Sequence, residues 1–443
     1  MYQDTIAAIS TPIGQAGIGI VRLSGRDARA IAQKVFTGQL ANRRLALGHL
    51  IDPDSGEMVD EVLATYMAAP HTYTREDVVE INCHSGPVPL QRALELLLRY
   101  GARMANPGEF TLRAFLNGRL DLAQAESVLD IVRSRTAAGL RLAVQGLGGG
   151  LSQRIKAVRA ELMSVLAYLT ARIDFPEDEV EERDVLQPLI EARRDLAELI
   201  DSAYAGIIYR QGVRIAIVGR PNVGKSSLLN CLLRQSRAIV TPIPGTTRDT
   251  LEEVVNLKGV PFVLVDTAGI IKSHDLVESL GVERSRQAIE QADLVLLVVD
   301  GSQRLTAADR EIAGLLGEKP VLVAANKSDL PQKAALDELP WPVVSICALT
   351  GDGVAELEER MVSTVFGGKV FTSDALLVSN PRHKEALERA ERHVAQAQTS
   401  LEAHMPDDFI TIDLTAALSA LGEITGETVQ DELLETIFSQ FCI

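Results

Sequence analysis

The sequence predicts a multidomain protein with α/β and all-α parts, in which a P-loop nucleotide domain is inserted into a helical bundle. Three observations support this prediction. A glycine loop of the P-loop pattern, Gly219–Ser227, lies between a strand-like and a helix-like segment. Segments with helical periodicity occur both before and after that region. The chain from 1 to 118 alternates short strand-like and helix-like segments, which indicates a small α/β domain.

The composition is that of a soluble globular protein with two or three domains. The chain has 443 residues, of which 46% are hydrophobic and 23% charged. No apolar run approaches the length of a bilayer span, and the N-terminus lacks a basic region followed by an apolar core. We therefore expect a cytoplasmic protein without a membrane segment.

Charge and cysteine spacing exclude further classes. The net charge of −16 argues against a broadly basic nucleic-acid binder, so any RNA contact needs a local patch or a basic partner. The cysteines lie far apart without C-x-x-C spacing, which predicts reduced thiols and neither a disulfide framework nor a zinc site.

The P-loop supplies the first set of candidate phosphate ligands. Val213–Val218 is rich in β-branched residues and reads as a buried strand, and a helix follows from Ser227. Backbone N–H groups of such a loop face a phosphate. Lys225 supplies a charge to the β- and γ-phosphates, and the Ser226 hydroxyl can ligate Mg²⁺. The expected nucleotide ligands here are Asn222, Val223, Gly224, Lys225, Ser226 and Ser227.

Two further motifs are expected to close over the γ-phosphate. Gly245–Asp249 supplies Thr247, which we expect to ligate Mg²⁺ together with Ser226. Val263–Gly269 is a hydrophobic strand that ends in Asp266, which can hold the Mg²⁺ shell. The expected nucleotide contacts from these segments are Thr241, Pro242, Ile243, Pro244, Gly245, Thr246, Thr247, Asp266, Thr267, Ala268 and Gly269.

The last two motifs select the base. Asp329, in the run Asn326-Lys327-Ser328-Asp329, can accept hydrogen bonds from the ring N–H and the exocyclic amine of guanine, a donor pair that adenine lacks. Cys347-Ala348 stands where GTPases place Ser-Ala, whose backbone N–H contacts the guanine oxygen. Cysteine in place of serine should matter little if that contact is made by the main chain. Five motifs in order are highly specific for GTP binding; the residues expected here are Asn326, Lys327, Asp329, Cys347 and Ala348.

The catalytic group is less clear from these motifs. Ile270 stands where many small GTPases carry the glutamine that orients the attacking water, and isoleucine cannot do this. Asn222 and the loop Thr241–Thr246 offer oxygens that could hold a monovalent cation beside the phosphates. The polar stretch after Ile270 leaves three candidates for orienting the water: His274, Asp275 and Glu278.

In the N-terminal segment, Arg22 and Glu80 are charges within or at the end of apolar strands. Each lies either on a solvent face or in a buried pocket. The expected strands are Thr5–Ile9, Gly19–Leu23, Val62–Met67 and Asp77–Asn82, and the expected helices are Ala28–Phe36 and Pro89–Tyr100.

Helical segments fill 119–209 and 371–443, on either side of the nucleotide domain at 210–370. Such an insertion would link the nucleotide state mechanically to the bundle. The helical pattern runs from Leu120 through Val144 and then over Leu151–Ile173, Val185–Ile208, His383–Ala403, Asp413–Ile424 and Thr428–Phe438. One basic stretch is either an ordinary charged helix surface or a phosphate-contacting patch: Arg133, Arg135, Arg141, Arg154, Lys156 and Arg159.

Over nearly its full length the chain resembles the MnmE or TrmE family of tRNA-modification GTPases. Besides the nucleotide motifs, the block Pro107–Glu126 is highly specific for this family. The resemblance extends to Thr11–Gly14 with Gly19–Gly25, to Ile173–Asp178 and to the terminal Phe438–Ile443.

The resemblance implies how the nucleotide domain works. Such domains depend on potassium, with Asn222, Thr241, Ile243 and Thr246 at the ion-binding positions. Glu278 matches the water-orienting glutamate of the family, so the implied catalytic residues are Glu278, Lys225 and Asp266. GTP brings the two nucleotide domains of a homodimer together.

The resemblance also assigns the N-terminal domain. It implies dimerisation through this domain and binding of a reduced folate, 5-formyltetrahydrofolate or methylenetetrahydrofolate, by Arg22, Glu80 and Arg119. Arg119 replaces a residue that is often lysine, which keeps the charge but changes the geometry. With an FAD-dependent partner, in a heterotetramer, such proteins place an aminomethyl or carboxymethylaminomethyl group on C5 of the wobble uridine of tRNA.

The C-terminus departs from the family pattern. Members usually end in Cys-Ile/Leu-Gly-Lys, whereas this chain stops at Cys442-Ile443. The terminal lysine is expected at the folate pocket, so either two residues are missing from the sequence or the folate site has one charge fewer. Cys442 is a candidate reactive thiol or a packing thiol.

Two other functions compete with tRNA modification. A ribosome-associated GTPase switch would share the nucleotide domain, but would carry a KH-like G-x-x-G loop or a second nucleotide domain, and neither is visible in the sequence. A folate-binding scaffold with a regulatory nucleotide domain is the other alternative.

Overall fold

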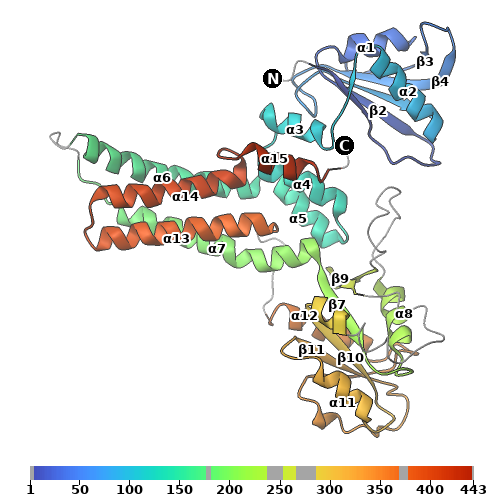
Figure 1. Cartoon of the computed structure of the whole chain (residues 1–443), viewed down its shortest axis with the longest axis vertical. Coiled ribbons are helices and arrows are strands. Elements are labelled where there is room, and N and C mark those ends of the chain that lie inside the picture. Colours follow the sequence, from blue (N-terminus) through green and yellow to red (C-terminus); the bar gives the residue numbers. More distant parts are fainter. Residues whose placement is uncertain (1–3, 176–180, 237–252, 266–285, 369–377, 442–443) are drawn as a thin grey trace.

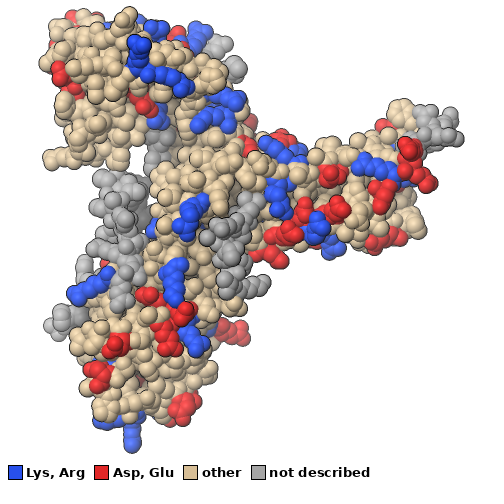
Figure 2. Space-filling model, turned by 180° about the vertical axis from the view of Figure 1, so that it is seen from behind, with Lys and Arg blue, Asp and Glu red and all other residues tan. Residues whose placement is uncertain are grey.

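The computed structural model describes residues 4–175, 181–236, 253–265, 286–368 and 378–441. These residues form an N-terminal sheet domain, an elongated helical domain and a nucleotide domain (Figure 1). The N-terminal and nucleotide domains lie at the same end of the helical domain, whose other end projects away from both as an arm (Figures 1 and 2). The structure thus has the predicted architecture of α/β parts combined with a helical bundle.

Among the described residues, the N-terminal domain forms a six-stranded sheet of order β3-β4-β5-β2-β1-β6. The pairs are antiparallel except for β1 with β6. Three of its elements, β3, β6 and α3, were not predicted. The strands are β1 Ile6–Ile9, β2 Gly19–Ser24, β3 Leu45–Ile51, β4 Met58–Met67, β5 Val78–Cys83 and β6 Arg103–Met104, and the helices are α1 Ala28–Val35, α2 Pro87–Arg99 and α3 Glu109–Leu116.

Helices α1 and α2 pack on one face of this sheet and share a core with its strands. On the opposite face, Phe110 of α3 packs against the buried residues Ile6 and Ala8 of β1. Towards β3 and β4 that face carries exposed leucines: Leu45, Leu47 and Leu63 have 59%, 65% and 36% of their surface exposed. The sheet is therefore covered on one side and largely open on the other.

The helical domain combines segments from both sides of the nucleotide domain. Helices α13 and α14 pack along α6 and α7, and all four contribute to one apolar core (Figure 1). This arrangement confirms that the bundle is discontinuous in sequence. Its helices are α4 Leu122–Arg133, α5 Ala137–Leu147, α6 Gly150–Asp174, α7 Leu186–Gln211, α13 Pro381–Glu402, α14 Asp407–Thr425 and α15 Asp431–Phe438.

The helical pattern predicted from Leu120 through Val144 is interrupted. Helix α4 ends at Arg133, and α5 begins after Thr136, whose hydroxyl accepts a hydrogen bond from the backbone N–H of Gly139 at 3.1 Å. A threonine N-cap of this kind starts a new helix. Periodicity alone missed the break because apolar spacing is similar in both helices.

The described part of the nucleotide domain forms a sheet of six strands in the order β12-β11-β10-β7-β9-β8. All pairs are parallel except β8 with β9. Every residue of β10 is buried, as expected for a parallel strand with packing on both faces. The elements are β7 Val213–Val218, α8 Lys225–Ser236, β8 Val254–Leu257, β9 Val260–Leu264, β10 Leu294–Asp300, α11 Ala307–Gly314, β11 Val321–Asn326, β12 Val343–Ile346 and α12 Val354–Val365.

Within the residues that the structure describes, no helix is both long and apolar enough to cross a lipid bilayer.

Candidate functional site

The P-loop connects strand β7 to helix α8, as the sequence predicts. Gly219 and Gly224 have φ values of 150° and 104°, which side chains rarely adopt. A Cβ on Gly224 would also collide with the side-chain amide of Asn326. Asn222 has a φ of 65°, in the left-handed region that asparagine tolerates better than most residues. The loop conformation therefore explains these residue types.

Lys225 begins helix α8, and its ammonium lies inside the loop. Its Nζ donates hydrogen bonds to the backbone oxygens of Gly219 at 2.7 Å and Arg220 at 2.8 Å. Burial lowers the pKa of Lys225, because desolvation disfavours the charged form. Ser226 and Ser227 follow in the first turn of the same helix. The cation is thus held where the loop would receive a phosphate.

Asn326 connects the P-loop to the base-recognition loop. Its side-chain nitrogen donates to the backbone oxygen of Val223 at 2.8 Å, and its side-chain oxygen accepts from the backbone N–H of Ala348 at 2.9 Å. Asn326 is buried at the end of β11. Three of the predicted motifs are therefore joined through one amide side chain.

Cys347 also contacts the base-recognition motif through its side chain. The Sγ donates to Oδ1 of Asp329 over 3.2 Å. The sequence predicts a main-chain role for this residue, to which the structure adds a thiol contact with the carboxylate predicted to read guanine. Sequence reasoning also missed Asp300, whose Oδ2 lies 2.6 Å from Nζ of Lys327. Its place at the end of strand β10 is a usable signal.

A further set of predicted ligands lies outside the described residues. They are Thr241, Pro242, Ile243, Pro244, Gly245, Thr246, Thr247, Asp266, Thr267, Ala268, Gly269, Glu278 and Cys442, together with the alternatives His274 and Asp275.

In the N-terminal domain, Arg22 and Glu80 pair directly across strands β2 and β5. The Arg22 Nε and Nη2 atoms lie 2.8 and 2.7 Å from Oε1 of Glu80, and both side chains are less than one-third exposed. The Arg22 guanidinium lies over the ring of Phe110, 5.7 Å from its centre. These charges form an ion pair beside an aromatic ring, on the sheet face opposite α1 and α2.

Arg119 lies on the same side of this domain. Its Nη1 donates to the backbone oxygen of Tyr73 at 3.2 Å, and its guanidinium lies 4.8 Å from the centre of the Tyr73 ring. Tyr73 packs against the apolar cluster that contains Phe110. Arg119 and Arg22 therefore lie over rings that belong to one apolar cluster, which places the three predicted residues on the same side of the domain.

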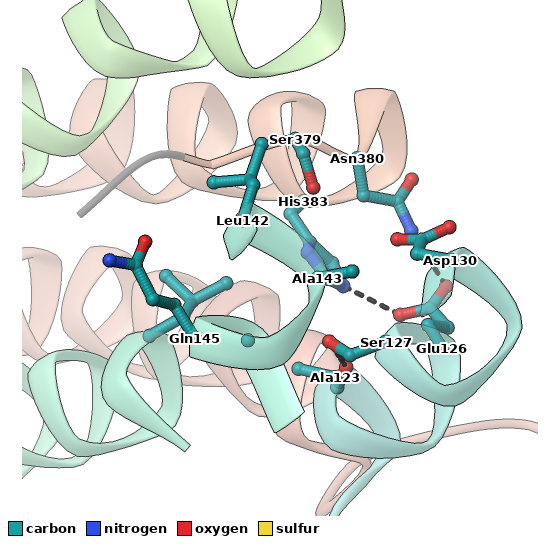
Figure 3. A pocket seen from close by; sticks show the side chains of 12 residues that line it. Ala123, Glu126, Ser127, Asp130, Leu142, Ala143, Gln145, Ser379, Asn380 and His383 are labelled. Carbon is teal, nitrogen blue, oxygen red and sulfur yellow. Dashed lines mark hydrogen bonds and ion pairs between the residues drawn. The ribbon is translucent and has the colours of Figure 1, made fainter. Parts of the chain in front are cut away.

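A buried polar cluster on α4 was not predicted. Oε2 of Glu126 lies 2.6 Å from Nε2 of His383 and 2.6 Å from Nη2 of Arg382, and Oε1 accepts from the Asn380 side chain at 2.8 Å. Figure 3 shows His383 and Asn380 pointing towards Glu126, beside a cavity of about 20 Å³. Such a volume holds about one water molecule. A larger cleft of about 480 Å³ adjoins the same cluster and is lined by Glu126, Asp130, Arg210, Asn380 and Arg382 among others.

The electrostatics of this cluster favour a charged Glu126. Burial alone would raise the pKa of the carboxyl, but the charge and hydrogen bond of His383, together with Arg382, outweigh it and lower the pKa of Glu126 to about 2. One turn along α4, Oδ1 of Asp130 lies 2.6 Å from Nε of Arg210.

The cluster lies where both chain connections of the nucleotide domain meet helix α4. Arg210 is near the end of α7, directly before the nucleotide domain, whereas Arg382 and His383 are in the first turn of α13, after that domain. Both are bound to carboxylates one turn apart on α4, the helix that follows α3 of the N-terminal domain. Glu126 belongs to the block Pro107–Glu126, but the sequence alone assigned it no role.

The basic stretch on the helices has carboxylate partners. Arg154 pairs with Glu198 at 3.2 Å, Lys156 lies 3.8 Å from Asp121, and Arg159 pairs with Glu427. These contacts favour an ordinary charged helix surface over a phosphate-contacting patch at these three positions.

Comparison with known proteins covers the chain from near its start to near its end. A family model described as GTP-binding protein TrmE N-terminus matches residues 5–119, and one described as MnmE helical domain matches residues 122–442. The tRNA modification GTPase MnmE of Chloroflexus aurantiacus is 52% identical over 449 residues, covering 99% of both chains. The protein of the same name from Alkaliphilus oremlandii is 47% identical over 459 residues and covers both chains fully.

Among solved structures, a single-substitution variant of Aquifex aeolicus Era bound to GDP and AlF₄⁻ is 30% identical, over 41% of this chain and 66% of that chain, with a TM-score of 0.26.

Proposed function

Because the chain belongs to the MnmE family of tRNA modification GTPases, we propose that it uses GTP hydrolysis to modify C5 of the wobble uridine of tRNA with a reduced-folate one-carbon unit. The protein is a GTP hydrolase that acts in tRNA modification. The observation that carries this proposal is the match to named relatives over nearly the whole length of both chains.

In the nucleotide domain, the described residues of the sequence motifs each have a task in this reaction. When GTP binds, the Lys225 ammonium releases the backbone oxygens of Gly219 and Arg220 and binds oxygens of the β- and γ-phosphates instead. Asp329 reads guanine, with Cys347 holding one of its oxygens. Asn326 holds the base-recognition loop against the P-loop.

Mg²⁺ fits the start of helix α8. A serine hydroxyl next to the P-loop lysine is the kind of hard oxygen donor that Mg²⁺ prefers, and Ser226 occupies this place. Ser226 and Thr247 would hold the ion, which supplies positive charge beside the phosphates when bound.

Potassium and Glu278 complete the hydrolytic site in this proposal. Asn222, Thr241, Ile243 and Thr246 hold K⁺, and Glu278 orients the attacking water, since Ile270 cannot. Hydrolysis should therefore be faster in K⁺ than in Na⁺ at equal ionic strength. Replacing Glu278 with alanine should slow hydrolysis while GTP affinity stays nearly unchanged, and the same change at exposed Glu290 serves as the control.

Equal rates in both salts would reject the potassium site. Unchanged turnover after Glu278→Ala would reject that residue as the one that orients water.

In the N-terminal domain, Arg22, Glu80 and Arg119 bind the reduced folate, either 5-formyltetrahydrofolate or methylenetetrahydrofolate. The support is their clustering around Phe110 and Tyr73, which offers charged groups and flat rings side by side. Glu80→Gln should weaken binding of 5-formyltetrahydrofolate about tenfold or more, because it removes a charged hydrogen-bond partner. Glu95→Gln, on an exposed position of α2, is the matched control.

The protein forms a homodimer through the open face of the N-terminal sheet. Exposed leucines gathered on one face, such as Leu45, Leu47 and Leu63, are typical of an interaction surface. An FAD-dependent partner joins the dimer in a heterotetramer, which we expect to work in the cytoplasm. Figure 2 shows Lys and Arg side chains on the N-terminal domain and a group of acidic side chains on the helical arm. With a net charge of −16, the chain suits a partner that supplies part of the tRNA surface.

The Glu126 cluster couples the nucleotide state to the rest of the protein. Arg210 and Arg382, on the two chain connections of the nucleotide domain, are both anchored on α4. A movement of the nucleotide domain therefore acts on the helix next to the N-terminal domain.

The test is wobble-uridine analysis by mass spectrometry in a strain that lacks this chain, with and without the chain restored. We expect the carboxymethylaminomethyl or aminomethyl group to be lost on deletion and recovered on restoration. Intact modification in the deletion strain would contradict the proposal, and would agree instead with a GTPase switch that does no covalent RNA chemistry. In vitro, the same product should form from tRNA, GTP, reduced folate, the flavoprotein partner and an amine, because the folate supplies only the methylene carbon: ammonium gives the aminomethyl group and glycine the carboxymethylaminomethyl group.

A further inference from the structure

A second concave site opens beside the Arg22–Glu80 pair, and its charge is one-sided. A cleft of about 630 Å³ in the N-terminal domain is lined by Arg43, Arg75 and Arg119, with His71 between them in the chain. Among the described residues that line it, none is an aspartate or a glutamate. In a chain with a net charge of −16, three arginines around one cleft without a carboxylate indicate a binding site for an anion.

The backbone at this cleft is strained at two of the three arginines. Arg43 and Arg75 have φ values of 58° and 60°, in the left-handed region, which costs a residue with a Cβ about 1–2 kcal/mol. Glycine or asparagine would fit such positions better. Four other described residues with a Cβ share this property: Asn222 and Lys327 belong to the nucleotide motifs, and Lys258 and His404 lie outside them. Two strained arginines that line the same cleft are consistent with a use for their side chains.

Each guanidinium is held in place by the main chain. Nη2 of Arg43 donates to the backbone oxygen of His71 at 2.7 Å, Nη1 of Arg75 donates to that of Asn117 at 3.0 Å, and Arg119 donates to that of Tyr73 at 3.2 Å. Each of these contacts uses one of the five N–H donors of a guanidinium. The arginines are thus oriented by neutral carbonyl groups, which do not cancel their charge.

The cleft adjoins the proposed folate residues along the sheet. Thr65 of β4 lines the cleft and stands directly opposite Glu80 of β5, which stands opposite Arg22 of β2. Side chains of directly opposed residues lie about 5 Å apart on the same face. A ligand whose ring system sits at Arg22 and Glu80 would therefore reach the arginines with its far end.

We infer that the Arg43, Arg75 and Arg119 cleft binds the carboxylates of the glutamate tail of a reduced folate, so that the site favours folates with a chain of several glutamates. This inference rests on the proposed folate function. A glutamate chain carries one free carboxylate for each residue added, and arginine binds carboxylates in paired, charge-assisted hydrogen bonds. Contiguity with Arg22 and Glu80 favours the folate tail over the phosphates of tRNA.

The test compares 5-formyltetrahydrofolate carrying one glutamate with the same compound carrying several, by titration calorimetry on the full chain. The variants are Arg43→Asn, Arg75→Asn and the double variant, since asparagine removes the charge but tolerates a positive φ. Arg44→Asn, an exposed arginine next in the chain that does not line the cleft, is the control. Equal melting temperatures show that each variant is folded.

We expect the parent and Arg44→Asn to bind the long-tailed folate about tenfold or more tightly than the short-tailed one, with a preference that shrinks as salt rises. The double variant should lose that preference and bind the short-tailed folate almost as before. If the parent binds both folates equally, the proposed role of the cleft is wrong, while folate binding itself still stands. No folate binding at all would overturn both proposals. If the double variant binds tRNA more weakly but folates as before, the cleft binds phosphates of tRNA, and the proposal that it binds the glutamate tail is wrong.

Discussion

The sheet of the nucleotide domain and the sheet of the N-terminal domain differ in how many of their faces are buried. Every residue of β10 is buried, whereas β4 alternates from Val62 to Met67 between buried positions and positions that are partly or fully exposed. Parallel strands joined by helices are covered on both faces, and antiparallel strands leave one face open. In the first sheet, the predicted site residue Asn326 is therefore the last residue of its strand. In the second, Arg22 and Glu80 lie in mid-strand on the open face, and Arg119 lies beyond the strands, after α3.

This difference predicts unequal tolerance to a charge on each sheet. Leu296→Lys places an unpaired charge in a fully buried strand and should destabilise the nucleotide domain by on the order of 5 kcal/mol, enough to unfold it. Leu47→Lys, on an exposed position of β3, should change the free energy of unfolding by less than about 0.5 kcal/mol and instead shift the protein towards monomer. Chemical denaturation and size-exclusion chromatography measure the two effects. Equal destabilisation by the two substitutions would contradict the comparison.

The two sites should also fail independently. Lys225→Ala removes the cation that the P-loop directs at the phosphates, so GTP hydrolysis should fall about 10²–10³-fold. Binding of 5-formyltetrahydrofolate should not change, because the lysine belongs to the other sheet. Lys258→Ala, which removes an exposed lysine of the nucleotide domain, is the control for lost charge. Loss of folate binding with Lys225→Ala would show that the sites are not separate.

The connection between the domains should be sensitive to a single carboxylate. Glu126→Gln leaves Arg382 and His383 without their buried anion and should cost about 3 kcal/mol of unfolding free energy. It should also reduce tRNA modification more than basal GTP hydrolysis, since the coupling helix loses its anchor. The same change at exposed Glu161 of α6 is the control, and equal losses in both activities would argue for a structural effect alone.

Acid should act on the same carboxylate. The pKa of Glu126 is lowered to about 2 in the folded protein from about 4.5. A carboxyl with a lowered pKa contributes its stability above about pH 4.5, and that contribution is lost as pH falls towards 2. The unfolding free energy of the parent should therefore drop more steeply between these pH values than that of Glu126→Gln. Parallel curves would mean that Glu126 is not the charged partner of His383.

The smallest expected effect concerns Cys347. Removing the thiol contact to Asp329 with Cys347→Ala should weaken GTP binding several-fold, because a single hydrogen bond contributes about 1 kcal/mol. Cys347→Ser keeps a donor and should retain most of the affinity. If alanine and serine behave alike in nucleotide titrations, the contact has no role in positioning Asp329.

Local patterns in the sequence predicted those features that depend on residues close together in the chain. The P-loop between β7 and α8, the buried strand β10 and the split helical bundle all follow from short-range periodicity and motif spacing. The anchors on α4 could not be predicted this way, since Glu126 and His383 stand 257 positions apart and no spacing rule relates them. Strand β3 was missed because Leu45 and Leu47 are apolar on an exposed face, so burial and polarity do not alternate there.

The separate nucleotide and folate sites must still serve one reaction on tRNA. The most direct test is mass spectrometry of the wobble uridine in a deletion strain that carries either Lys225→Ala or Glu80→Gln. The first variant should retain folate binding and the second GTP hydrolysis, yet neither should restore the modified uridine. Full modification with either variant would contradict the claim that the nucleotide site and the open sheet face act together on tRNA.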